Sequence, residues 1–180
     1  MRYVSITIGG SYVRLGVGRG LREFPGLSLY ADGTGIGDES IFERVEVGEN
    51  QIALRSLLGG YLQAHPDGFM LSNPAIGEWE TFTEVWWPDD RISLKSAHGT
   101  FLCAEGGGGG PVLANRTAAG DWEKFFYEVP PPELLPAEEP VEESSPFRTR
   151  VEDSQARSAL AREIASQHLE NEPRKSPFGP

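Results

Sequence analysis

The sequence predicts an all-β fold, a single β-trefoil built from three four-stranded repeats of about 40 residues each. Three observations lead to this prediction. The stretch IGEWETF at 76–82 returns as AGDWEKF at 119–125, apolar residues alternate upstream of both copies, and glycine-rich turns separate the alternating runs. The expected organisation is a trefoil at 1–129, an extended Pro/Glu-rich linker at 130–148, a C-terminal α-helix at 149–172 and a terminal tail at 173–180.

The second and third repeats align closely with each other. Residues 52–64 (IALRSLLGGYLQA) lie over residues 92–104 (ISLKSAHGTFLCA) without a gap. The glycines, tryptophans and phenylalanines that recur after these segments are Gly77, Trp79, Phe82, Gly120, Trp122 and Phe125. Short alternating runs bounded by turns are typical of strands. In a trefoil, half of these strands close a barrel and the others cap it as hairpins, which leaves no long exposed sheet edge.

The first repeat is a worn copy of the other two. GIGDESIF at 35–42 lies over the recurring pattern, with Glu39 in the place of the tryptophan. Upstream, Val13 and Leu15 are placed over the first two alternating apolar residues of the segment 52–64. The sequence leaves open whether this repeat lost its tryptophan by drift or for use.

The recurring tryptophan and phenylalanine have a structural and a functional interpretation. We expect Trp79 and Trp122 to be buried and to help close the barrel, because a tryptophan buries a large apolar area. The alternative is a ligand site that is used twice. Glu80 and Glu123, which follow the tryptophans, are placed to bond backbone N–H groups of their loops.

The repeated motifs resemble the fascin family. The segments that carry the resemblance are ALRSLLGGYLQA, SLKSAHGTFLCAE, IGEWETF and AGDWEKF, and it covers about residues 1–129. The resemblance implies a β-trefoil and, as fascins bundle actin filaments, an actin-binding role. Two facts depart from that pattern: fascins string four trefoils together, and here there is one. Residues 1–129 carry 10 basic and 17 acidic side chains, a net charge of −7, and actin is acidic as well.

The charge and the residue types exclude several functions. The whole chain has a net charge of −11, which is unsuited to nucleic acid or to an anionic membrane surface. The one cysteine, Cys103, occupies a polar repeat position, so we expect it to be partly exposed and inert. The three histidines have no metal-ligand spacing, and no catalytic motif is present. We therefore expect no enzyme activity, no cofactor and no metal.

The amino terminus bears on localisation. Met-Arg-Tyr-Val is not the start of an apolar signal region, so the sequence favours a protein that is not secreted by a signal peptide. We expect it in the cytoplasm or within a viral or other protein shell.

Trp86 and Trp87 form a tandem that the third repeat lacks. Adjacent side chains of a strand point to opposite faces, so one of the two rings should face outward. An outward tryptophan suits either a partner contact or stacking against a sugar.

The C-terminal region predicts docking to a protein partner. The linker is too rich in Pro and Glu to form a core, although Leu134 and Leu135 are candidates to pin it to a surface. A capping box opens the predicted helix and Pro173 follows it. The thin apolar stripe of that helix comprises Val151, Ala156, Leu160, Ile164 and Leu169.

Three functional hypotheses result. The main one is a non-catalytic protein-interaction or structural subunit, whose trefoil is displayed and whose tail anchors it to a larger assembly, such as a capsid decoration protein. The first alternative is an actin-filament-binding module. The second is a carbohydrate-binding trefoil, although the Gln-x-Trp signature of ricin-type lectins is absent from the chain.

Overall fold

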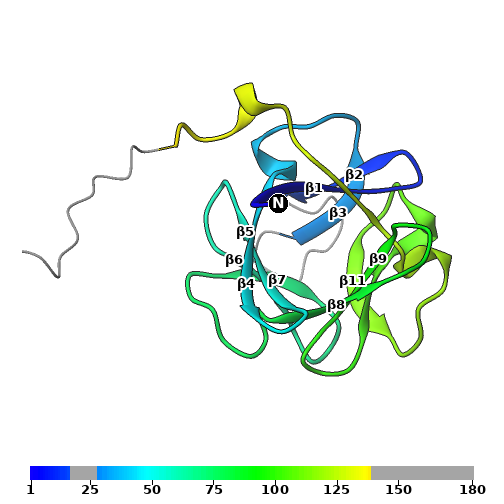
Figure 1. Cartoon of the computed structure of the whole chain (residues 1–180). Coiled ribbons are helices and arrows are strands. Elements are labelled where there is room, and N and C mark those ends of the chain that lie inside the picture. Colours follow the sequence, from blue (N-terminus) through cyan, green and yellow to red (C-terminus); the bar gives the residue numbers. More distant parts are fainter. Residues whose placement is uncertain (17–27, 139–180) are drawn as a thin grey trace, which may run out of the picture. The chain divides into compact units, whose positions relative to one another are not determined.

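The computed structural model describes residues 1–16 and 28–138 (Figure 1). The chain divides into two compact units, Met1–Pro136 and Ala137–Pro180. The predicted C-terminal helix and terminal tail, with the stripe of Val151, Ala156, Leu160, Ile164 and Leu169, lie outside the described residues, as does most of the linker.

The described part is a β-trefoil with twelve strands, four in each repeat, as predicted. The first repeat holds β1 (Tyr3–Ile8), β2 (Ser11–Gly16), β3 (Ser28–Gly33) and β4 (Phe42–Gly48). The second holds β5 (Gln51–Ser56), β6 (Tyr61–Ala64), β7 (Met70–Asn73) and β8 (Phe82–Trp86). The third holds β9 (Ile92–Lys95), β10 (Phe101–Ala104), β11 (Val112–Arg116) and β12 (Phe126–Glu128). Four 3-10 turns accompany the strands: η1 (Asp38–Ser40), η2 (Glu105–Gly107), η3 (Asp121–Glu123) and η4 (Pro132–Leu134).

The first and fourth strands of each repeat form the barrel (Figure 1). Antiparallel pairs run β1–β4–β5–β8–β9, and β12 pairs with β1. The circle closes at Phe125, just before β12, because its backbone exchanges two hydrogen bonds with that of Ile92, both 2.8 Å long. The chain ends of the barrel, β1 and β12, are therefore neighbours.

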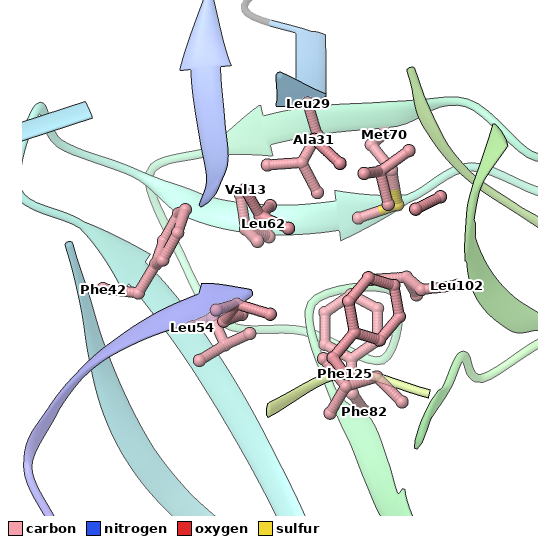
Figure 2. Close-up of a cluster of buried hydrophobic side chains, with 14 of the residues drawn as sticks. Val13, Leu29, Ala31, Phe42, Leu54, Leu62, Met70, Phe82, Leu102 and Phe125 are labelled. Carbon is pink, nitrogen blue, oxygen red and sulfur yellow. The ribbon is translucent and has the colours of Figure 1, made fainter. Parts of the chain in front are cut away.

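The hairpins β2–β3, β6–β7 and β10–β11 cover one end of the barrel. Backbone hydrogen bonds tie them together, from Ala31 to Gly110 and from Ala114 to Gly68, each 2.8 Å long. Between barrel and hairpins lies one apolar core, and three phenylalanines with no more than 1% exposure contribute to it: Phe42, Phe82 and Phe125 (Figure 2). The void lined by Ile6, Val13, Leu29 and their neighbours in this core is about 10 Å³, so these side chains are closely packed.

The strand register shows the pseudo-threefold relation and corrects one predicted alignment. Phe42 pairs with Val4, and the corresponding pairs in the other repeats are Phe82 with Ile52 and Phe125 with Ile92. Val4 is thus the counterpart of Ile52.

Val13 and Leu15 do not occupy the predicted places on the first strand, because both lie on β2. The turn of the first hairpin is one residue shorter than in the second repeat: Thr7 pairs with Tyr12, whereas Arg55 pairs with Tyr61. That deletion, together with a second alternating apolar run, shifted the alignment by one strand.

A polar triad lies at three equivalent places in the barrel, two residues after each core phenylalanine. Arg44, Glu84 and Tyr127 occupy these places, and each side chain points inward like the phenylalanine before it. The Arg44 guanidinium donates two hydrogen bonds to the Glu84 carboxylate, of 2.7 and 2.6 Å, and the Tyr127 hydroxyl donates a third of 2.7 Å. Burial would raise the pKa of Glu84, but these bonds outweigh it and hold the pKa below its ordinary value.

Candidate functional site

The recurring Gly-x-Trp-Glu-x-Phe motif forms a tight turn that leads into the fourth strand of a repeat. In the second repeat, the Gly77 amide donates a 2.8 Å hydrogen bond to the Glu80 carboxylate, and in the third the Gly120 amide donates one of 2.7 Å to Glu123. Both carboxylates are buried. This is the return half of a capping box, and it confirms the predicted role of the two glutamates.

The glycine of the motif leaves space for the capping carboxylate. An ideal Cβ at Gly77 would lie 2.9 Å from the Glu80 carboxylate, and one at Gly120 would lie 3.1 Å from Glu123. A side chain at either glycine would have to displace the capping carboxylate, so glycine is favoured at the residue that the carboxylate caps.

The two motif tryptophans are on the surface, and the prediction that they are buried was wrong. Trp79 is 37% exposed and Trp122 is 46% exposed. The phenylalanine of the turn fills the barrel and the glutamate caps the turn from inside. Because the phenylalanine and the glutamate occupy the inner side of the turn, the indole lies on its outer side.

Neighbouring hairpin turns hold each indole at its edges. Trp79 meets His65 and His98 edge-on, with ring centroids 5.6 and 5.3 Å away. Its backbone oxygen accepts a 2.9 Å hydrogen bond from the Ala64 amide. Trp122 lies against Gly107, where an ideal Cβ would be 3.0 Å from Nε1 of the indole.

The first repeat has an open pocket at the corresponding turn. Its free volume is about 410 Å³. It is lined by Arg14, Asp32, Gly33, Thr34, Gly35, Ile36, Gly37 and Glu39. Glu39 occupies the place of the tryptophan, and Ser40 occupies the place of the capping glutamate. Ser40 keeps the turn intact, because its hydroxyl accepts a 2.9 Å hydrogen bond from the Gly37 amide.

The replacement of a glutamate by Ser40 frees the side chains that face it. In the second repeat, Gln63 and Asn73 both donate hydrogen bonds to Glu80, of 2.5 and 2.9 Å. Arg14 stands at the position of Gln63 in the first repeat and instead makes a two-pronged contact with Asp32, at 2.6 and 3.0 Å. This contact raises the pKa of Arg14 and places a cation and a carboxylate side by side in the pocket wall.

Glu39 completes the polar lining. A Cβ at Gly37 would lie 2.7 Å from Oε2 of Glu39, so the carboxylate folds back over the turn. Within residues 1–16 and 28–138, no group donates a hydrogen bond to this carboxylate. The pocket therefore offers a carboxylate with free acceptor capacity beside an Arg–Asp pair.

Trp86 and Trp87 differ in exposure, but strand alternation does not explain the difference, because Trp86 lies on the same face of β8 as Phe82 and Glu84 and is exposed where the strand ends. Trp86 is 53% exposed and meets Tyr127 edge-on, with ring centroids 5.9 Å apart. Trp87 is half-buried: its Nε1 donates a 2.9 Å hydrogen bond to the Ser93 hydroxyl, and the Lys124 ammonium lies 4.1 Å from the ring centroid.

The two leucines that were expected to pin the linker to a surface differ in exposure. Leu134 is exposed at the end of η4, and Leu135 beside it is half-buried.

Cys103 is fully buried, which corrects the expectation of partial exposure. The hydrophobic core and the neighbouring Glu123 together raise the pKa of its thiol to about 12. Among the described residues, no cluster of His, Cys, Asp and Glu could hold a metal ion, and no helix is long and apolar enough to cross a membrane.

Sequence reasoning missed the pocket residues Arg14, Asp32 and Glu39. One signal was visible, because Glu39 breaks the repeat pattern where the other copies have tryptophan. Arg14 and Asp32 had no such signal, since the misplaced alignment of the first repeat hid that Arg14 corresponds to Gln63.

Comparisons with known proteins agree with the trefoil architecture. No family model matches the chain, and no curated protein matches it either. Among solved structures, a designed threefold-symmetric protein, ThreeFoil, has a TM-score of 0.56 at 19% identity, over 69% of this chain and 96% of its own.

Two structures of proteins with a bound saccharide are similar to this chain at a comparable level. A Polyporus squamosus lectin bound to a sialylated trisaccharide epitope has a TM-score of 0.57 at 15% identity, over 70% of this chain and 48% of its own. SeviL bound to the asialo-GM1 saccharide has a TM-score of 0.52 at 14% identity, over 71% of this chain and 97% of its own. At these identities the likeness establishes the fold.

Proposed function

We propose that this trefoil is a non-catalytic carbohydrate-binding domain and that the pocket of the first repeat is its principal site. The observation that carries the proposal is the open volume of about 410 Å³ at the one motif turn that lacks a tryptophan. Its volume lies in the range of small-ligand sites.

The lining suits a saccharide because it combines fixed donors and acceptors. Asp32 and Glu39 offer carboxylate oxygens to sugar hydroxyls, and Arg14 offers N–H groups in a fixed plane. The Arg14–Asp32 contact holds both side chains in one geometry before a ligand arrives, which lowers the entropy cost of binding. Two similar trefoils bind saccharides, and their likeness supports the proposal.

The sharpest test is to restore the tryptophan of the other repeats. Glu39→Trp should fill the pocket and abolish binding of the oligosaccharides that the wild type retains on a glycan array. Asp38→Trp adds the same bulk next door, at an exposed residue that does not line the pocket, and should bind normally. A wild type that binds no glycan, or a Glu39→Trp variant that binds as well as the wild type, would contradict the proposal.

A protein-binding role is the second candidate, and the exposed ring of Trp86 favours it. In this proposal the trefoil is displayed on a larger assembly, in the cytoplasm or in a protein shell, and the C-terminal region anchors it. A pull-down that compares the full chain with residues 1–138 tests the anchoring. If the C-terminal region is the anchor, only the full chain should recover the assembly. Co-sedimentation with filaments tests the actin role that the fascin resemblance implies. The net negative charge of residues 1–129 argues against that role, because actin is acidic as well.

A further inference from the structure

The pocket of the first repeat carries an excess negative charge. Of its charged lining residues, Arg14 is positive, whereas Asp32 and Glu39 are negative, which leaves a net charge of −1. Arg14 is already engaged by both oxygens of Asp32. Glu39 interacts with Arg14 through its charge without a hydrogen bond to it, so the pocket keeps one carboxylate in excess.

The Glu39 carboxylate can accept hydrogen bonds from a cationic group of a ligand. It is only partly exposed, and no described residue donates a hydrogen bond to it. A carboxylate that loses water when a ligand enters needs a replacement donor, and a charged donor gives a stronger bond than a neutral one. An anionic ligand would meet this charge, and the net charge of −7 on residues 1–129, without compensation.

We propose that this pocket selects saccharides that carry a free amine and rejects acidic ones, with Glu39 as the counter-ion of the ammonium group. This inference rests on the proposed carbohydrate function and names its ligand class. The specificity comes from a single position, where two repeats have tryptophan and the first has glutamate.

Calorimetry with three matched trisaccharides tests the inference. A glucosamine trimer and cellotriose share the β-1,4-linked glucose backbone and differ in an ammonium or a hydroxyl at C2, and an oligoglucuronate of the same length is the acidic member. The wild type should bind the glucosamine trimer about fivefold more tightly than cellotriose, the range of a partly screened ion pair, and should not bind the glucuronate. The preference for the amine should weaken as salt is added.

The variant Glu39→Gln keeps the shape of the side chain and removes its charge. It should bind the glucosamine trimer and cellotriose equally, because the preference for the amine depends on the charge of Glu39. Asp38→Asn makes the same charge change beside the pocket and should keep the preference.

The outcomes separate the two claims. If the wild type binds none of the three sugars, the amine selectivity is wrong, and if a glycan array is empty as well, the carbohydrate function itself fails. If it binds them without preferring the amine, or if Glu39→Gln keeps the preference, the carbohydrate function stands and the amine selectivity is wrong.

Discussion

At the scale of single residues, the triad of Arg44, Glu84 and Tyr127 shows how a charge is accommodated in a trefoil barrel. Glu84 has a side chain that is 2% exposed, and a carboxylate at such a site is tolerated only with partners. Two bonds from Arg44 and one from Tyr127 supply them. Removal of one partner should therefore cost more than the net value of the contact.

Tyr127→Phe removes only the hydroxyl of the triad. We expect it to lower the free energy of unfolding by about 1–3 kcal/mol at pH 7, the range for a hydrogen bond to a charged group. The pKa of Glu84 is lowered in the fold, so its contribution is present above the pKa of the unfolded chain and is lost as the pH falls through the folded value. The deficit of the variant should accordingly shrink in acid. Urea unfolding at pH 7 and at pH 3 measures both effects, and an equal deficit at the two pH values would contradict this account.

Cys103 should not react while the protein is folded. Its side chain is fully buried and its thiol pKa is raised to about 12, so hardly any thiolate is present at pH 8. A thiol reagent should label the chain only after urea unfolding. Fast labelling of the native protein would show that the third repeat opens locally around β10.

At the scale of elements, the capped turn that precedes β4, β8 and the segment leading to β12 is the repeating unit of the fold. The same glycine amide is bonded in all three repeats, but the acceptor is a serine hydroxyl in the first and a carboxylate in the others. The turn was therefore preserved while the surface above it changed.

Substitution of the acceptors should reveal this difference. Glu80→Ala removes three hydrogen bonds to a buried carboxylate and leaves Gln63 and Asn73 unpaired, so we expect a loss of about 2–4 kcal/mol. Ser40→Ala removes one cap and should cost about 1 kcal/mol. Chemical denaturation of the two variants provides the comparison, and equal losses would mean that the network around Glu80 adds nothing to the cap.

The elements also show how far sequence reasoning reached. The repeat spacing and the alternating apolar residues predicted twelve strands and a trefoil, because burial in a barrel constrains every second residue. The direction of Trp79 was not predictable in that way, since a tight turn has no such alternation. The pocket of the first repeat was not predicted, because it is formed by side chains from β2, β3 and η1. A one-residue deletion in this repeat had misaligned these segments with the other repeats.

At the scale of the whole molecule, the trefoil unit reaches beyond the last barrel strand. Its compact unit ends at Pro136, and Pro130 is buried although it follows β12. A chain of residues 1–138 should therefore unfold within about 2 °C of the full-length protein. A chain of residues 1–129 should unfold at a lower temperature, because it lacks the apolar contacts of Pro130. Calorimetric melting of the three chains decides this, and equal melting of the two truncations would place the boundary at 129.

The triad has a further consequence for how the three repeats relate to one another. Each repeat supplies one member at the equivalent position of the barrel, namely a cation, an anion and a phenol, and the three bond to one another. A chain with two copies of the second repeat would bring two carboxylates together there, and two copies of the first would bring two guanidinium groups together. The repeats are thus complementary parts that cannot be interchanged, although their strands pair in the same register.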